Sequence, residues 1–423
     1  SLALGLIVGV LTTLSIKFLI SRCERDAASL SSEAARLHSS EIAVKKIVNG
    51  VEGLIGNTPM IKIRSLSKAT GCEILAKAEF LNPGGSPKDR VALNMIQMAE
   101  EQGLIQPNTG CVIFEGTSGS TGISIAMIAR AKGYGAWIVM PDDQAQEKYQ
   151  LLEKLGAHVE KTRPASIVDE NQYVNLAKRR ALEFSGGKEH EADNDSNGGK
   201  GRGFFADQFE NLANFQAHCY GTGPEIYKQT DGKISAFVAG AGTGGTIGGV
   251  SSYLKPLIPK LKVFLVDPPG SGLYHKIKHN IMYSPYEAEG SRRRHQVDTV
   301  IEGVGLNRLT KNFDLAREFI DDAIRVTDQE AVQMARYLVR EEGLFIGSSS
   351  AMNCVGAVRV ARMLGPGHRI VTILCDSGQR HLTKFWNDEY LREHDILQQQ
   401  IPSIDILSGS NKNSGDDPLS FIM

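Results

Sequence analysis

A lysine at the start of an expected helix is the first residue whose type and place could do chemistry. The segment from Asn82 to Arg90 reads NPGGSPKDR, and its prolines and glycines indicate a turn before a helix from Val91 to Glu101. The helix macrodipole disfavours a cation at the N-terminus and lowers the pKa of an amine there. Lys88 is therefore a candidate nucleophilic or Schiff-base lysine, with a solvated surface lysine as the alternative.

A loop rich in hydroxyl groups follows the next expected strand. Residues 115–122 read EGTSGSTG, between an apolar run at 111–114 and a helical pattern that begins at Gly122. Backbone N–H groups at a helix start, together with hydroxyls, can bind a carboxylate or a phosphate. A tight turn with a Ser or Thr N-cap is the alternative, because that is the commonest use of such residues. Glu115 could be a catalytic acid or could satisfy the backbone of this turn.

A glycine-rich loop, GAGTGGTIGG at residues 240–249, follows a further apolar run. Such a strand–loop–helix unit binds phosphate through its backbone N–H groups. A dinucleotide site has some support, because Asp267 ends the next expected strand, where a ribose-binding acid would lie. The spacing from Gly242 is G-x-G-x-x-x-G, however, and the lysine of a P-loop is absent. The loop therefore indicates a phosphate site without saying which phosphate.

Short apolar strands alternate with helical patterns through the main body of the chain, and this alternation must position the three segments. Expected strands are residues 111–114, 136–140, 236–239, 263–266 and 370–374, with helices at 144–155 and 247–254. Alternating strands and helices predict parallel sheets with right-handed crossovers. Ligands of such sheets bind at the carboxyl ends of the strands, so the glycine-rich turns mark the expected site.

The composition limits the class of protein. Of 423 residues, 41% are hydrophobic and 22% charged, which is typical of a globular protein with two or more domains. A formal net charge of -1 without a long basic stripe argues against a nucleic-acid partner. Six cysteines without a CxxC pair argue for free thiols in a reducing compartment. His275 and His279 have the spacing of helix metal ligands, but no third ligand is in view, so no metal is expected. Cys219, beside His218, is expected to be a packed cysteine.

The apolar stretch at residues 1–20 predicts a transmembrane helix. Leu2 to Ile20 are apolar or small apart from three hydroxyl residues and Lys17, which is about the 20 apolar residues needed to cross a bilayer. Arg22 and Arg25 follow, which predicts that the rest of the chain faces the cytosol. The expected location is the mitochondrial outer membrane with a single-pass anchor, and an amphipathic targeting peptide is the alternative.

Taken together, the three segments resemble one family. NPGGSPKDR is similar to the lysine motif of fold-type II pyridoxal-phosphate enzymes, especially cysteine synthase (O-acetylserine sulfhydrylase) and cystathionine β-synthase. TSGSTG resembles their substrate-carboxylate loop and GTGGT their phosphate loop. The N-terminal anchor resembles that of a fungal cysteine-synthase-like protein of the mitochondrial outer membrane. The resemblance runs in family order from about Ile47 to Leu391 and includes DQFEN (207–211), IEGVG (301–305), GSSSA (347–351) and DSG (376–378).

This resemblance implies a tryptophan synthase β-like α/β fold with two three-layer domains. Residues 185–203 and 284–296 are expected to be surface insertions, and family members are typically homodimers, so a homodimer is expected here. The expected division is a transmembrane anchor (1–20), a polar linker (21–45), a large pyridoxal-phosphate-binding domain (46–94 and 209–395), a small substrate-closing domain (95–208) and a polar tail (396–423).

The resemblance also assigns roles to residues. Lys88 would bind pyridoxal 5'-phosphate covalently and would then remove the α-proton of the substrate as general base. Ser120 would lie beside the cofactor ring, and Ser377 would hydrogen-bond the pyridine nitrogen. The cofactor phosphate would lie on the backbone of Gly242, Thr243, Gly244, Gly245 and Thr246. The amino-acid substrate would be held by Thr117, Ser118, Gly119, Thr121, Gln208 and Gly303.

The implied reaction is β-replacement, in which O-acetyl-L-serine and sulfide give L-cysteine and acetate. Condensation of serine with homocysteine, or β-elimination alone, is the alternative within the family, favoured by Asp376, Ser377 and the LTKF at residues 382–385. Ser120 stands where cysteine synthases have Asn, which raises the alternative of a weakened enzyme or a scaffold. A dinucleotide-dependent oxidoreductase is the alternative from another class, supported only by the glycine loop and Asp267.

Overall fold

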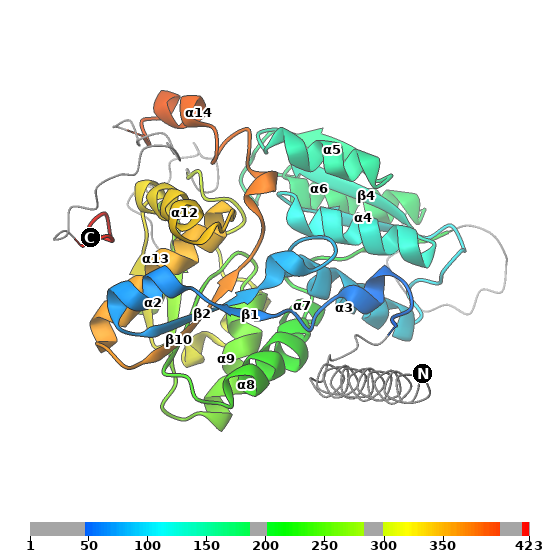
Figure 1. Ribbon diagram of the computed structural model, residues 1–423. Coiled ribbons are helices and arrows are strands. Elements are labelled where there is room, and N and C mark those ends of the chain that lie inside the picture. The colour runs from blue at the N-terminus through cyan, green and yellow to red at the C-terminus, as the bar shows by residue number, and fades with distance from the viewer. Residues whose placement is uncertain (1–46, 187–200, 283–298, 398–416, 423) are drawn as a thin grey trace, which may run out of the picture. The chain divides into compact units, whose positions relative to one another are not determined.

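The computed structural model describes residues 47–186, 201–282, 299–397 and 417–422. From Gly50 onwards these residues form two β-sheets, each with helices packed on it (Figure 1). The expected anchor and linker, and most of both insertions, lie outside the described residues. Within the described ranges, no helix is long and apolar enough to cross a bilayer.

Six strands form the larger sheet, in the order β1-β2-β10-β7-β8-β9. The pair β1–β2 is antiparallel and the other pairs are parallel. The last strand in sequence, β10, lies in the middle, so its carboxyl end meets the segments that follow β2 and β7, namely the lysine segment and the glycine-rich loop. The strands are β1 (Met60–Lys62), β2 (Glu73–Ala78), β7 (Ala236–Gly240), β8 (Lys262–Asp267), β9 (Asp322–Arg325) and β10 (Arg369–Leu374).

Strand β7 illustrates how this sheet builds a core on each face. Ala236 and Val238 belong to the core on one side, and Phe237 and Ala239 to the core on the other. Apolar residues facing both ways explain why these strands read as continuous apolar runs rather than as alternating patterns. The helices of the first core are α2 (Arg64–Thr70), α12 (Asp328–Glu342) and α13 (Ser348–Leu364), and those of the second are α8 (Gly223–Thr230), α9 (Gly245–Leu257) and α10 (Leu273–His279).

Four parallel strands form the smaller sheet, in the order β5-β4-β3-β6. Three helices share one core with this sheet, and α6 packs against it in a separate small cluster. The strands are β3 (Val112–Gly116), β4 (Gly135–Pro141), β5 (His158–Thr162) and β6 (Gly203–Phe205), and the helices are α3 (Lys88–Glu101), α4 (Ser120–Lys132), α5 (Gln146–Lys154) and α6 (Tyr173–Phe184).

Short elements complete the described chain. They are the helices α7 (Ala213–Ala217), α11 (Lys311–Asp314) and α14 (Asp388–Glu393), a π-helical turn η3 (His218–Thr222), and the 3-10 turns η1 (Val51–Leu54), η2 (Glu79–Leu81), η4 (Arg317–Phe319) and η5 (Gly378–Arg380).

The predicted α/β class with parallel sheets is confirmed, and the five predicted strands agree with β3, β4, β7, β8 and β10 to within one or two residues. The lysine helix begins at Lys88, three residues earlier than predicted. Pro87 has helical dihedral angles (φ −62°, ψ −13°), so the helix starts directly behind it.

The domain boundaries stay a prediction. Helix α3 crosses the expected boundary at residue 94, and Val91 and Met95, one on each side, both pack into the core of the smaller sheet.

The expected polar tail contains two buried apolar residues, Leu419 and Ile422, which join the core beside α12 and α13. Arg362 donates to the backbone carbonyls of both, which fixes this end of the chain.

Candidate active site

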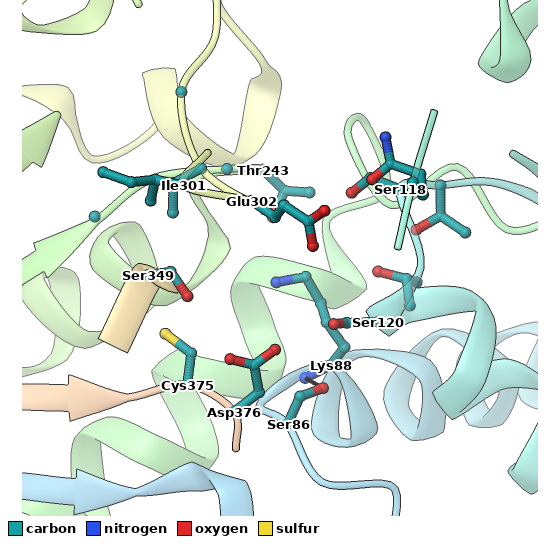
Figure 2. A pocket seen from close by; sticks show the side chains of 18 of the residues that line it. Ser86, Lys88, Ser118, Ser120, Thr243, Ile301, Glu302, Ser349, Cys375 and Asp376 are labelled. Atoms are coloured by element: carbon teal, nitrogen blue, oxygen red, sulfur yellow. Dashed lines mark hydrogen bonds between the residues drawn. The ribbon is translucent and has the colours of Figure 1, made fainter. Parts of the chain in front are cut away.

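A cavity of about 260 Å³ lies at the carboxyl ends of strands from both sheets. The topology brings the three segments singled out from the sequence to this cavity (Figure 2). Among the predicted site residues, Gly119, Gly245 and Ser377 do not line it. Those that do are Lys88, Thr117, Ser118, Ser120, Thr121, Gln208, Gly242, Thr243, Gly244, Thr246 and Gly303.

The Lys88 side chain extends into the cavity (Figure 2). Burial lowers the pKa of its amine, although Cys375 and Asp376 nearby act in the opposite direction. Its place at the first residue of α3 adds the unfavourable field of the helix N-terminus. An amine that is easily deprotonated and faces a cavity is suited to attack a carbonyl carbon, whereas a solvated surface lysine would have neither property.

The residue after Lys88 fixes the lysine segment to two neighbours. Asp89 Oδ2 accepts from the backbone N–H of Gly84 at 2.6 Å, and its Oδ1 accepts from Ser124 Oγ of α4 at 2.5 Å. Gly84 has no room for a side chain, because a Cβ there would collide with the Asp89 carboxylate. The turn before Lys88 is therefore held against α4, which carries the hydroxyl loop at its start.

The hydroxyl loop of residues 117–121 leads into α4 without a side-chain cap on that helix. The backbone N–H groups of the first turn are thus left without helical partners, beside four hydroxyl side chains. Thr121 Oγ1 donates to Gln208 Oε1 at 2.6 Å, and Gln208 Nε2 donates to Gly116 O at 3.2 Å. This arrangement suits an anionic group such as a carboxylate, because the helix dipole and the N–H groups both favour negative charge.

The glycine-rich loop of residues 242–246 leads into α9, which also lacks a side-chain cap. Gly244 has φ 86°, and a Cβ there would meet Phe313. Thr243 is held on both sides, because its hydroxyl accepts from Asn214 Nδ2 at 2.7 Å and its carbonyl accepts from Thr310 Oγ1 at 2.7 Å. A rigid loop whose backbone N–H groups lie at a helix start can bind a phosphate.

His218 packs beneath this loop. Its Nε2 lies 3.2 Å from Thr246 Oγ1, and its Nδ1 lies 2.9 Å from Thr222 Oγ1. Burial, with the cations of Arg90 and Lys88, lowers the pKa of His218 well below its usual range. A neutral His218 therefore orients Thr246. Burial raises the pKa of Cys219, which fits the expected packed thiol.

Two acids considered from the sequence lie outside the cavity wall. Glu115 accepts from the backbone N–H of Gln208 at 3.4 Å, and burial raises its pKa well above the usual range. Asp267 accepts from the backbone N–H of Tyr274 at 2.7 Å, and burial raises its pKa to about 7. Asp267 thus serves a backbone group near to it in the chain, and Glu115 serves one in the segment after β6. Neither of these two acids is therefore placed to bind a ribose beside the glycine-rich loop.

At the end of β10, Cys375 lines the cavity and Ser377 does not. Ser377 Oγ accepts from the backbone N–H of Gln379 at 3.3 Å and donates to Phe345 O at 3.5 Å. Burial raises the pKa of Cys375 to about 12, so its thiol is neutral. The predicted contact of Ser377 with a pyridine nitrogen stays a prediction, and Cys375, two residues earlier, was not predicted as a site residue.

Four charged side chains form one wall of the cavity. Lys148 of α5 forms an ion pair with Glu302, and His381 Nδ1 lies 3.3 Å from the same carboxylate oxygen. The other ring nitrogen of His381, Nε2, lies 2.9 Å from Asp376 Oδ2. Lys148, Glu302 and His381 were not predicted as site residues. Glu302 lies in the IEGVG segment quoted for the resemblance, but no local pattern marks Lys148 or His381.

The electrostatics of this wall favour charged forms despite burial. Burial opposes the charge of His381, yet Asp376 and Glu302 outweigh it and raise its pKa to about 9. Burial likewise opposes the charge of Glu302, and Lys148 and His381 outweigh it and hold its pKa far below the usual range. At neutral pH the wall therefore contains two cations and two anions.

No group of three or more metal-ligating side chains occurs among the described residues. His275 and His279 lie on α10 with ring centroids 5.7 Å apart. They are adjacent on one helix face, and within the described part of the chain they belong to no such group.

The cavity fits pyridoxal phosphate. A half-buried amine of lowered pKa is present to bind an aldehyde, and the N-terminus of α9 is present to bind a phosphate. Gly242 leaves space that a Cβ would remove, since such an atom would collide with Gly303 O. The thiol of Cys375, which lines the same cavity, is uncharged.

Comparison with known proteins agrees with this geometry. Residues 51–376 match the family described as "Pyridoxal-phosphate dependent enzyme". The chain is 58% identical over 376 residues to "Cysteine synthase 2" of Schizosaccharomyces pombe, an alignment that covers 89% of this chain and 93% of the relative. It is 54% identical over 358 residues to "Putative mitochondrial cysteine synthase" of Saccharomyces cerevisiae, covering 84% and 88%.

Solved structures share the architecture. The crystal structure of O-ureido-L-serine synthase matches with a TM-score of 0.67 at 29% identity, covering 80% of this chain and 95% of the other.

Proposed function

Since this chain belongs to the pyridoxal-phosphate dependent enzymes, and among them to the cysteine synthases, we propose that it replaces the acetoxy group of O-acetyl-L-serine by sulfide. The products are L-cysteine and acetate. The observation that carries this proposal is the meeting of three elements in one cavity: the half-buried Lys88, the uncapped start of α4, and the uncapped start of α9.

Pyridoxal phosphate supplies, when bound, an electron sink that makes the α-proton of an amino acid removable. We assign Lys88 to hold it, and the backbone of residues 242–246 to hold its phosphate. Thr246, oriented by His218, and Thr243, held by Asn214, keep that loop in its phosphate-binding conformation.

The substrate carboxylate is assigned to the hydroxyl loop and the first turn of α4. Gln208, locked by its bonds to Thr121 and to Gly116, presents its amide from the opposite side. These contacts place the α-carbon of the substrate near Lys88. Lys88 takes the α-proton, the bond from the β-carbon to oxygen breaks and acetate leaves. A bond from the β-carbon to sulfur forms, and Lys88 returns the proton.

Ser120 bears on the rate and on the choice of substrate. Its side chain lines the cavity, and its carbonyl accepts from Ser124 Oγ at 3.0 Å. A serine hydroxyl is shorter than the Asn amide expected at this position, so its contact with a bound cofactor ring would run through water. On this basis Ser120→Asn raises the turnover number, whereas a scaffold without activity would stay inactive.

The test is a visible absorption spectrum of the purified protein, recorded before and after O-acetylserine and again after sulfide. The band of the lysine-bound cofactor should change with O-acetylserine and return with sulfide. Lys88→Ala should abolish the band and the activity, and Lys154→Ala, which changes an exposed lysine of α5, should leave both unchanged. A band that responds only to serine with homocysteine would favour the cystathionine-forming alternative, and no band would refute the proposal.

We further propose that residues 1–20 anchor the protein in the mitochondrial outer membrane and that two copies form a homodimer. Support comes from the apolar stretch Leu2–Ile20, from the resemblance in sequence, and from the word "mitochondrial" in the name of the S. cerevisiae relative. Alkaline carbonate extraction of isolated mitochondria tests the anchor, since removal of residues 1–20 should release the protein. Light scattering of the purified protein tests the dimer.

A further inference from the structure

Beside the cavity, the smaller-sheet part of the molecule is joined to the larger-sheet part by a set of polar contacts that we call the clasp. Its smaller-sheet members lie at the start of α5, and its larger-sheet members lie in the loop after α10 and in the segment after η5. The members are Asp143, Glu147 and Lys148 on one side, and Glu302, His381, Thr383 and Lys384 on the other.

The outer part of the clasp is formed by direct hydrogen bonds. Glu147 accepts from the backbone N–H of Thr383 at 2.7 Å and from its hydroxyl at 2.8 Å. Lys384 Nζ donates to the backbone carbonyl of Asp143. These contacts are exposed, so water can replace them and they contribute little to closure.

The inner part of the clasp is buried and charged. Lys148 and His381 are 3% and 2% exposed, and the Glu302 side chain that joins them is 11% exposed. Glu302 Oε1 and Asp376 Oδ1 are buried without a hydrogen-bond partner. The negative charge of each carboxylate is therefore compensated mainly at its other oxygen. His381 Nε2 hydrogen-bonds Asp376 there, and His381 Nδ1 lies within ion-pair distance of Glu302 without a hydrogen bond. Removing one partner from such a buried group leaves an uncompensated charge.

The groups that face His381 come from several elements. Asp376 lies at the end of β10 and Glu302 lies in the loop after α10, with Lys148 of α5 behind Glu302 and Arg380 of η5 near Asp376. The ring of Phe385 meets His381 edge-on at 6.4 Å. Gly347, just before α13, allows this packing, because a Cβ there would collide with Asp376 and His381.

The histidine also connects the clasp to the catalytic lysine. Asp376 lies close enough to Lys88 to raise the pKa of its amine, and Figure 2 shows both side chains at the same cavity. A protonated His381 keeps Asp376 ionised and also holds Glu302 in position for Lys148. One side chain thus lies between the strand end next to Lys88 and the helix that covers the cavity.

We propose that His381 is a positioning residue that, by bridging Asp376 and Glu302, holds α5 closed over the cavity and fixes the end of β10 beside Lys88. The part of this inference that concerns turnover rests on the proposed function, whereas the part that concerns closure of α5 does not. Closure excludes water from the reacting groups, and sulfide enters or product leaves when the clasp opens.

The first experiment measures closure by amide hydrogen exchange of the full-length holoenzyme, compared between wild type, His381→Gln and Lys148→Met. The control is His279→Gln, which changes an exposed histidine of α10, outside the clasp. We expect exchange in residues 143–150 and 381–386 to become about tenfold faster or more in both clasp variants, because each breaks a buried ion pair. Exchange in β7 should stay as in wild type.

Unchanged exchange at the clasp in both variants would overturn the proposal. Equal acceleration in β7 would also overturn it, since that result means a general loss of stability. Because exchange does not require turnover, this outcome is independent of whether the protein makes cysteine. If His381→Gln does not fold, Lys148→Met decides.

The second experiment is the pH dependence of turnover. In wild type, kcat should fall as the pH rises through about 9, where His381 loses its proton. In His381→Gln, kcat should be lower and this fall should be absent. If kcat of His381→Gln still falls near pH 9, the fall belongs to another titrating group, and the role of His381 is contradicted.

Discussion

Replacement of Glu225 tests whether a buried ion network holds the segment that carries Lys88. Glu225 of α8 accepts from Arg90 Nη1 at 2.6 Å and Nη2 at 2.8 Å, and from Lys77 Nζ at 2.5 Å. Its side chain is 16% exposed, whereas Lys77 is fully buried. Arg90 also bonds Glu79 at 2.8 Å. Because Arg90 follows Lys88 by two residues, this network fixes the first turn of α3.

The size of the effect follows from the pKa of Glu225. Burial opposes ionisation, but Arg90 and Lys77 outweigh it and lower this pKa from 4.5 to about 2. Such a displacement corresponds to about 3 kcal/mol of folding free energy in the ionised form. The folded pKa is the lower one, so this stability is present above pH 4.5 and is lost as the pH falls towards 2.

Thermal unfolding by circular dichroism measures this loss. Glu225→Gln should lower the Tm at pH 7 by about 3–4 °C, and the difference from wild type should shrink below pH 4.5. The matched control is Glu341→Gln, which removes a surface pair with the exposed Arg340 and should change stability by less than about 0.5 kcal/mol. Equal Tm values for both variants at pH 7 would refute the reasoning.

Three further changes address the substrate loop, the clasp and the end of the chain. Thr121→Val removes the donor to Gln208 Oε1 and should raise the KM for O-acetylserine about tenfold, with the cofactor spectrum unchanged; an unchanged KM would contradict the assigned carboxylate site. Gly347→Ala adds a Cβ that collides with Asp376. It should destabilise the protein by about 1–3 kcal/mol in urea unfolding and accelerate hydrogen exchange at the clasp. Wild-type behaviour would mean that Asp376 and His381 are loosely packed. Leu419→Ala removes a side chain that is 1% exposed and should cost about 2–5 kcal/mol by the same assay, with kcat retained; no loss would mean that the chain end is not packed.

The elements around the cavity could be predicted because their signals are local. Apolar runs that end in glycine mark β3 and β7, and the residues behind them become helix starts at the same sheet edges. Lys88 could be predicted for the same reason, since a lysine at a helix N-terminus is unusual and can be recognised from the local sequence. The start of α3 could not be set from the sequence, because a proline is compatible with either a turn or the beginning of a helix.

The charged wall could not be predicted because its members are distant in sequence. Lys148 reads as an ordinary helical lysine, and His381 reads as a loop residue. Only the placement of β4, β10 and the loop after α10 brings them to Glu302. The difference between Cys375 and Ser377 is of another kind. Both follow β10 closely, and the direction of the turn, fixed by the pairing of Ser377 with Ile346, decides which one faces the cavity.

The central place of β10 has a consequence for how the chain reaches this structure. Strand β10 joins β2 to β7, so Arg369 pairs with Glu73 across nearly 300 residues of chain. A ribosome must release almost the whole polypeptide before the larger sheet can close, while the smaller sheet, contained in residues 112–205, can assemble much earlier. Until then β2 and β7 lack the partner that separates them, and their unpaired edges need protection from other chains. We therefore expect the nascent enzyme to depend on chaperones until its last core strand emerges.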